Sequence, residues 1–283
     1  MQRETLRIRL SNGLSLEGVR YHGGARTPAV CLPGLTRNTR DFEDIAPVIA
    51  ATGRDAVAFS LRGRGGSDRA EDYLTYHPAT YRDDILEAMG ILDAPRAVFL
   101  GTSLGGITAM LIAAAAPERV AGAIINDVGP ELAPEGIARI VGYAGKTRAE
   151  AASLEDAASQ IRAVNEVAFP GRDADFWRAF ARRTYKENED GSLVLDYDQR
   201  IGKALVEAPP APDLWPAFAS LKGTPTLIIR GALSDLLSPE IVAKMRAVHP
   251  SFGYCEVAGV GHAPLLDEPE AVAAIGAFLA QID

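Results

Sequence analysis

The sequence has little cysteine, little histidine and no excess of positive charge. Its 283 residues include two cysteines and four histidines, and 29 lysines and arginines stand against 37 aspartates and glutamates, a formal net charge of −8. Two cysteines are too few for a disulfide scaffold. An acidic chain without a basic stripe cannot neutralise many phosphates. These scarcities exclude a small disulfide-bonded fold and a nucleic-acid partner.

Long apolar runs are also absent. The longest apolar stretch, residues 107–116, has about half of the roughly 20 residues that a bilayer-spanning helix needs. The first residues, which include Arg3 and Glu4, do not form the apolar region of a signal peptide. With 47% hydrophobic residues the chain can still bury a sizeable core. We therefore expect a soluble cytoplasmic protein with no membrane partner.

Short apolar runs alternate with segments of helical period in the first part of the chain and again near its end. An extended run before Asn12-Gly13 and another after it predict a hairpin. Runs typical of buried parallel strands follow at residues 29–32, 56–59, 97–100, 120–125, 226–229 and 254–257. Alternation of this kind predicts an α/β fold in which helices flank a mostly parallel sheet.

The alternation stops after Asp127. Residues 130–212 are rich in alanine, arginine and glutamate and favour helices, with one short strand-like run at Leu193–Leu195. We predict a core domain of residues 1–129 and 213–283 and a helical cap domain of residues 130–212. Trp177 and Phe180 are three residues apart, which predicts that they pack inside the cap, with lining of a pocket as the alternative.

A nucleophile motif follows the third of these parallel-strand runs. Residues 101–105 read Gly-Thr-Ser-Leu-Gly, a Gly-x-Ser-x-Gly pattern between a predicted strand and an apolar helix. Two glycines allow a turn too tight for side chains, and this turn would present Ser103 at the carboxyl end of the sheet, beside a helix N-terminus. Ser103 is therefore the candidate nucleophile.

A serine nucleophile needs an imidazole base that a carboxylate orients. His262 lies in the loop after the last predicted strand, at the same sheet edge as Ser103, whereas the other three histidines have positions typical of surface or capping residues. Asp235, in the loop after residues 226–229, is the preferred acid. Asp127, which follows residues 120–125, is the alternative acid or a residue that orients loop amides.

Four separated motifs carry a resemblance to a known superfamily: residues 33–35 (Pro-Gly-Leu), residues 62–68 (Arg-Gly-Arg-Gly-Gly-Ser-Asp), the serine turn, and Gly-His at 261–262 with Asp-Glu-Pro at 267–269. The chain resembles the α/β-hydrolase fold superfamily, in particular capped bacterial serine hydrolases that include enol-lactonases, carboxylesterases and carbon-carbon bond hydrolases. The resemblance implies an eight-stranded type of sheet with the cap inserted after strand 6. Pro33-Gly34 departs from the His-Gly usual at this place.

The resemblance also implies a reaction. The order Ser103, Asp235, His262 is that of the family, and the family analogy assigns the oxyanion hole to the amides of Leu35 and Leu104. We expect hydrolysis of a small carboxylic ester or lactone through an acyl-enzyme, without a cofactor or metal. One alternative is carbon-carbon bond hydrolysis of a diketone, although such members commonly have asparagine where this chain has Thr102. Another is a non-catalytic small-molecule-binding protein on the same fold.

One further residue is a candidate for substrate binding. Arg37, three residues after Gly34, could pair with a carboxylate of the substrate. We prefer the other interpretation, a surface ion pair of Arg37 with Asp41 or Glu43.

Overall fold

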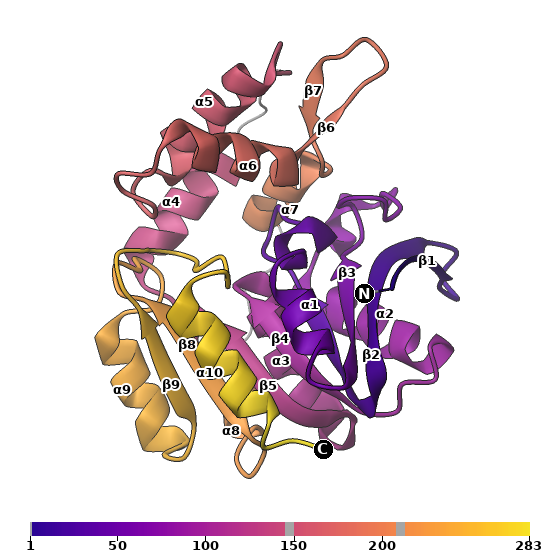
Figure 1. Ribbon diagram of the computed structural model, residues 1–283, viewed down its shortest axis with the longest axis vertical. Coiled ribbons are helices and arrows are strands. Elements are labelled where there is room, and N and C mark those ends of the chain that lie inside the picture. The colour runs from indigo at the N-terminus through magenta and orange to yellow at the C-terminus, as the bar shows by residue number, and fades with distance from the viewer. Residues whose placement is uncertain (1, 145–149, 208–212) are drawn as a thin grey trace.

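A computed structural model describes residues 2–144, 150–207 and 213–283 of the chain (Figure 1). Its centre is a seven-stranded sheet with the order β1-β2-β4-β5-β8-β9, and β3 pairs with β2. The strands are β1 (Arg3–Arg9), β2 (Ser15–Leu32), β3 (Arg54–Ser60), β4 (Ala97–Thr102), β5 (Val120–Asn126), β8 (Thr226–Gly231) and β9 (Gly253–Val257). From β2 through β4, β5, β8 and β9 all neighbours are parallel. The predicted α/β fold is therefore confirmed.

The long strand β2 occupies two places in the sheet. Its first half pairs with β1 as the predicted hairpin and, on its other side, antiparallel with β3. Its second half pairs with β3 again, so that Ala29 lies opposite Ala56, and also with β4. When the two halves of β2 are counted separately, the seven strands fill the eight strand positions expected of the sheet. In this count β5 is the sixth position, and the inserted segment follows it.

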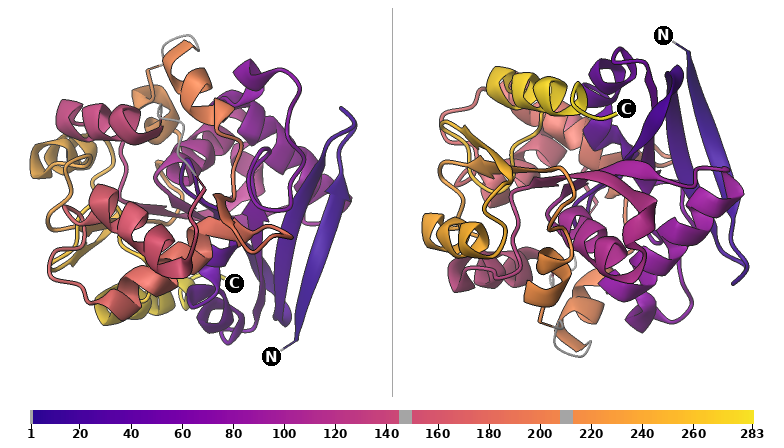
Figure 2. Two further views of the ribbon diagram at one scale, coloured as in Figure 1. Left: turned by 90° about the horizontal axis from the view of Figure 1, so that it is seen from above. Right: turned by 90° about the horizontal axis from the view of Figure 1, so that it is seen from below.

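Helices cover both faces of the sheet (Figure 2). On one face α1 (Ile45–Ala50) contacts α10 (Pro269–Leu279), and on the other α2 (Pro78–Ile91) and α8 (Trp215–Ala219) contact α3 (Leu104–Ala115). The helix α9 (Pro239–Val248) connects β8 to β9, and the hydroxyl of Ser238 accepts a hydrogen bond from the Ile241 amide at its start.

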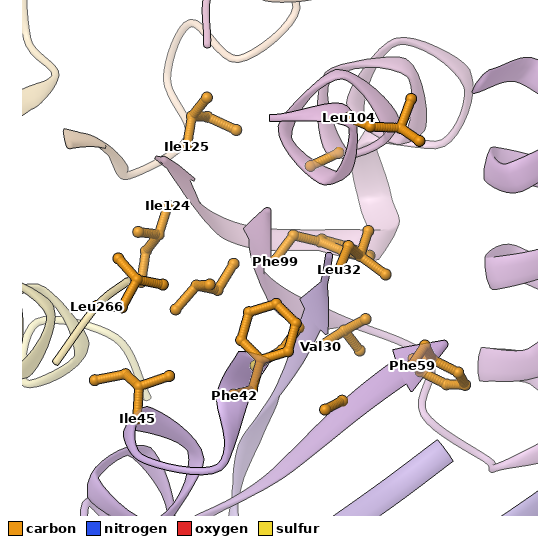
Figure 3. Packing of buried hydrophobic residues seen from close by; sticks show 14 of the residues in the cluster. Val30, Leu32, Phe42, Ile45, Phe59, Phe99, Leu104, Ile124, Ile125 and Leu266 are labelled. Carbon is orange, nitrogen blue, oxygen red and sulfur yellow. The ribbon is translucent and has the colours of Figure 1, made fainter. Parts of the chain in front are cut away.

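Buried hydrophobic side chains from the strands and from the neighbouring helices and loops pack together as the core (Figure 3). Strand residues such as Leu32, Phe99 and Ile125 are completely buried, and Leu104 at the start of α3 packs beside them. The central strands β4, β5 and β8 are covered on both sides and are largely apolar on both faces. The loops at their carboxyl ends consequently stand on a rigid base. The edge strand β9, predicted to be buried, is mostly exposed because no strand covers its outer side.

The inserted segment lies above the carboxyl edge of the sheet (Figure 1). Its elements are α4 (Pro134–Ala144), α5 (Leu154–Asn165), α6 (Ala174–Thr184), β6 (Tyr185–Glu187), β7 (Leu193–Leu195) and α7 (Arg200–Glu207). The sequence predicted the run at β7 but not its partner β6. Residues 208–212, at the predicted end of the cap, lie outside the described residues. The division into core and cap domains stays a prediction.

Within the inserted segment, Trp177 and Phe180 pack as expected, and Phe180 also lines a cavity, which was the alternative. They form an aromatic cluster with Phe169 and Phe176, with ring centroids 5.0 to 6.4 Å apart. Trp177 is 2% exposed and Phe180 is 8% exposed. None of the helices in the described part of the chain has the length and apolarity to cross a bilayer.

Candidate active site

Ser103 stands on a sharp turn between β4 and α3. Its backbone has φ 52° and ψ −114°, a left-handed conformation that is unfavourable for a residue with a side chain. The turn is compact because its flanking glycines have no side chains: a Cβ on Gly105 would lie 2.0 Å from the carbonyl oxygen of Leu32, and one on Gly101 would lie 2.3 Å from that of Gly105. The hydroxyl is therefore held at the sheet edge, at the N-terminus of α3.

The structure brings Ser103, His262 and Asp127 together. The Oγ of Ser103 lies 2.9 Å from Nε2 of His262, and Nδ1 of His262 lies 2.8 Å from Oδ2 of Asp127. The carboxylate of Asp127 accepts a hydrogen bond from Nδ1–H of His262. This fixes the ring proton on Nδ1 and leaves Nε2 free to accept the proton of the serine hydroxyl. This is the geometry that activates a serine nucleophile.

Asp127 is firmly fixed in this position. Its carboxylate is completely buried and also accepts hydrogen bonds from the Gly231 amide at 2.8 Å and from the Ser234 hydroxyl at 2.7 Å. Asp127 directly follows β5, which is the immediate neighbour of β4. Its backbone φ of 56° turns the chain sharply at the strand end. Both uses predicted for Asp127, as an acid and as an organiser of loop amides, are thus present in the geometry.

The preferred acid, Asp235, has a different partner, and its prediction is wrong. Its carboxylate accepts two hydrogen bonds from Arg139 of α4, from Nε at 2.5 Å and from an Nη at 2.9 Å. Partial burial acts to raise the pKa of Asp235, but the hydrogen bonds and charge of Arg139 outweigh it and hold this pKa below its ordinary value. Asp235 therefore fastens the inserted segment to the core.

The other three histidines lie away from Ser103. The Nδ1 of His77 accepts a hydrogen bond from the Ala79 amide at the start of α2, so His77 is the expected helix cap. His22 lies 3.4 Å from Glu4 on the N-terminal hairpin. His249 ends α9, but it is 2% exposed rather than superficial.

The two amides assigned to the oxyanion hole lie at the same edge of the sheet. Leu104 begins α3 directly after the serine, and Leu35 lies in the loop after β2, both at carboxyl ends of neighbouring parallel strands. Among the hydrogen bonds of the described residues, neither amide N–H has an acceptor. Both are thus available to a developing oxyanion.

A cavity of about 110 Å³ opens above Ser103 and His262. Its walls come from the loop after β2, from residues 263–266 and from the inserted segment. The inserted segment contributes mainly apolar side chains, namely Ile140, Ile161, Val164, Phe169, Phe180 and Leu195, with the polar groups of Tyr143, Asn165, Thr184 and Tyr197. Such a lining suits a small molecule with few polar groups.

Arg37 lines this cavity and forms the preferred ion pair with Asp41, although both side chains are mostly buried rather than at the surface. Its Nε lies 2.9 Å from Oδ2 of Asp41, and its Nη1 donates to the hydroxyl of Thr184. The guanidinium carbon lies 4.4 Å from the ring centroid of Phe180. Arg37 is therefore an ion-paired residue of the cavity wall, and its use in binding substrate stays a prediction.

Comparisons with known proteins agree with this fold. A model of the alpha/beta hydrolase family matches residues 29–275, which is most of the chain. The chain belongs to the alpha/beta hydrolase family. A 3-hydroxybutyrate-oligomer hydrolase of Cupriavidus necator is 32% identical to this α/β-hydrolase over 271 residues, which cover 91% of each chain.

Two further relatives extend the comparison. The crystal structure of an alpha/beta hydrolase from Novosphingobium aromaticivorans has a TM-score of 0.92 at 42% identity and covers 99% of this chain and 98% of its own. A 2-(acetamidomethylene)succinate hydrolase of Mesorhizobium japonicum is 27% identical over 231 residues, 81% of this chain and 79% of its own. This α/β-hydrolase is thus an enzyme of the hydrolase class, as expected.

Proposed function

We propose that this α/β-hydrolase is a serine hydrolase that cleaves a small carboxylic ester or lactone through an acyl-enzyme. The observation that carries the proposal is the line of hydrogen bonds from Ser103 through His262 to the buried Asp127, at 2.9 and 2.8 Å. Some reactions on this fold need a carboxylate nucleophile in the turn. Residue 103 is serine, so this chain does not have that nucleophile.

The proposed reaction has two steps. In the first, Nε2 of His262 takes the proton of Ser103, Oγ attacks the carbonyl carbon, and the amides of Leu35 and Leu104 stabilise the oxyanion. His262 then gives this proton to the leaving alkoxide. In the second, His262 deprotonates a water molecule, which attacks the acyl-enzyme, and then returns that proton to Oγ of Ser103 as the acyl–Oγ bond breaks and the carboxylic acid leaves. Asp127 holds the imidazole ring and stabilises its protonated form.

The size and lining of the cavity support a small substrate. A volume of about 110 Å³ is well below the several hundred Å³ of pockets that hold drug-sized ligands. The relative from Cupriavidus necator is named for hydrolysis of 3-hydroxybutyrate oligomers, which are short esters that carry one carboxylate. We propose short hydroxyacid esters as the first substrate class to test, with Arg37 near the carboxylate.

Purified protein would be assayed with p-nitrophenyl acetate and with the linear dimer of 3-hydroxybutyrate, with Ser103→Ala as the blank. The account predicts turnover of both by the parent protein and of neither by the variant. A fluorophosphonate probe should label the parent, and labelling should be lost in both Ser103→Ala and His262→Ala. Ester hydrolysis by Ser103→Ala at the parent rate would overturn the proposed mechanism.

A further inference from the structure

Two arginines, Arg54 and Arg64, are the largest fully buried side chains in the part of the chain that the structure describes. Neither forms an ion pair with a carboxylate among these residues, although burying an unpaired charge is costly. Arg54 donates to backbone carbonyls, including those of Leu279 and Ile282, and so holds the C-terminal helix. Arg64 lies at the opposite edge of the sheet, beside the candidate site.

Arg64 contacts the loop that carries one of the proposed oxyanion donors. Its Nε donates to the carbonyl oxygen of Leu35 at 2.9 Å. Its Nη1 donates to the carbonyl oxygen of Arg62 at 2.7 Å and to the hydroxyl of Tyr81 at 2.8 Å. The guanidinium carbon also lies 4.8 Å from the ring centroid of Tyr81 and 5.7 Å from that of Tyr76. The cation is therefore fixed in place, with one N–H directed at Leu35.

The guanidinium of Arg64 has no carboxylate partner among the described residues. Three acids of neighbouring segments are paired with other arginines, Asp84 with Arg62, Asp196 with Arg40 and Asp198 with Arg200. Glu17, next to Gly65 and Gly66, accepts hydrogen bonds from the Ser60 hydroxyl and the Gly66 amide. A positive charge that is kept out of water acts strongly on a negative charge that develops nearby. The oxyanion would form at the amide of Leu35, the residue whose carbonyl Arg64 holds.

Arg64 also joins the Leu35 loop to the inserted segment. Its backbone forms a bridge with that of Tyr197, and the amides of Gly65 and Asp198 bond to the carbonyls of Asp196 and Gly63 across the same boundary. Tyr197 and Leu35 both line the cavity. The Arg64 side chain therefore lies behind the cavity wall, where it can fix the loop without touching a substrate.

We infer that Arg64 is a positioning residue of the oxyanion hole: it fixes the Leu35 loop through the carbonyl of Leu35 and adds a buried positive charge behind the oxyanion. This inference rests on the proposed serine mechanism and extends it. It assigns to the second arginine of the Arg-Gly-Arg-Gly sequence at residues 62–65 a part in stabilising the transition state.

The test compares Arg64→Met, Arg64→Lys and the matched buried-arginine control Arg54→Met. Each variant would be assayed with p-nitrophenyl acetate and titrated with butylboronic acid, which forms a negatively charged tetrahedral adduct with an active serine. Removing one oxyanion donor typically costs a factor of about 100 to 1000, so disturbing its support in Arg64→Met should lower kcat about tenfold or more, with KM changed less than about threefold. The inhibition constant of the boronic acid should rise by a similar factor.

The other variants separate this effect from a loss of folding. Arg64→Lys keeps the charge but not the fork of donors, so it should recover part of the kcat and of the boronate affinity. Arg54→Met should lower Tm and leave kcat and boronate affinity per folded molecule unchanged.

Parent-like kcat and boronate affinity in Arg64→Met would overturn the inference while leaving the serine mechanism intact. Failure of both Arg64 variants to fold would make Arg64 a structural residue and would also overturn it, and activity in Ser103→Ala would overturn the mechanism itself.

Discussion

The carboxylate of Asp127 lies 2.8 Å from Nδ1 of His262, although 135 residues separate them in the sequence. Asp127 follows β5 and His262 follows β9, and β8 lies between these two strands. The contact therefore spans the carboxyl edge of the sheet above β8, whose last residue, Gly231, donates its amide to the same carboxylate. The carboxyl ends of four parallel strands, β4, β5, β8 and β9, thus hold the line of hydrogen bonds from Ser103 through His262 to Asp127, with Ser103 at the end of β4.

Replacing each of the two candidate acids separates their roles. Asp127→Asn should lower kcat for ester hydrolysis by about 1000-fold to 10,000-fold, because an amide no longer holds His262 in the required tautomer. Asp235→Asn should change kcat by less than about tenfold and lower the free energy of unfolding by about 1 kcal/mol or less, because its ion pair with Arg139 is partly exposed. A large loss of kcat in Asp235→Asn, with Asp127→Asn nearly as active as the parent, would contradict this assignment.

Gly105, the second glycine of the serine turn, can be compared with a glycine whose surroundings leave room for a side chain. In Gly105→Ala the new Cβ would lie 2.0 Å from the carbonyl oxygen of Leu32, so the turn must distort. We expect the free energy of unfolding to fall by about 2 kcal/mol or more and activity to be lost with it. Denaturant unfolding followed by circular dichroism measures the first effect.

Gly276 in α10 is the control. A Cβ there has no heavy atom within 4 Å, so Gly276→Ala should gain about 0.5–1 kcal/mol from its higher helix propensity. Equal stabilities of the two variants would show that the turn does not need a glycine at 105.

The buried His249 should make the stability depend on pH. Burial lowers its pKa, so between the folded pKa and the ordinary value of about 6.5 the unfolded chain binds more protons than the folded one. The free energy of unfolding therefore has its full value above about pH 6.5. It decreases as the pH falls from there towards the pKa of His249 in the folded protein.

His249→Phe removes this titration and leaves a ring of suitable shape beside Phe218 and Phe252. Tm would be measured for both proteins at several values of pH. The difference in Tm between the variant and the parent should rise in favour of the variant as pH falls from about 7 to about 5. A difference that does not change with pH would mean that His249 is protonated equally in both states.

Arg37 is expected to affect the choice between charged and neutral esters. Arg37→Met removes from the cavity wall a cation that is paired with Asp41. A substrate carboxylate would lose a partner, whereas a neutral ester has no such contact to lose. KM for the 3-hydroxybutyrate dimer should rise by about threefold to tenfold, and KM for p-nitrophenyl acetate should stay within about twofold. Equal changes in both would assign Arg37 to the structure of the wall alone.

The sheet and the serine turn could be predicted because short sequence patterns determine them. Buried parallel strands give apolar runs, and the hairpin at residues 12–13 pairs Arg9 with Ser15 beside the turn. The turn at Ser103 needs glycines at 101 and 105 for steric reasons that operate within a few residues. Local chemistry alone is sufficient in these places.

The choice of acid could not be predicted in the same way. Asp127 and Asp235 both follow parallel strands, and their roles differ because Arg139, 96 residues before Asp235, takes one carboxylate and His262 takes the other. The short strand β6 has no apolar run of its own and forms by pairing with β7. The partners of Arg64 depend equally on contacts between distant segments, so no local pattern reports them.

The most direct measurement of the proposed mechanism is to trap the acyl-enzyme. Protein mixed rapidly with p-nitrophenyl acetate would be quenched in acid within the first turnover, digested and analysed by mass spectrometry. The account predicts one acetyl group on Ser103, formed with a burst of nitrophenol, and neither burst nor acetyl group in Ser103→Ala. Steady hydrolysis by the parent protein with acetyl groups elsewhere, or with the same burst in Ser103→Ala, would contradict it.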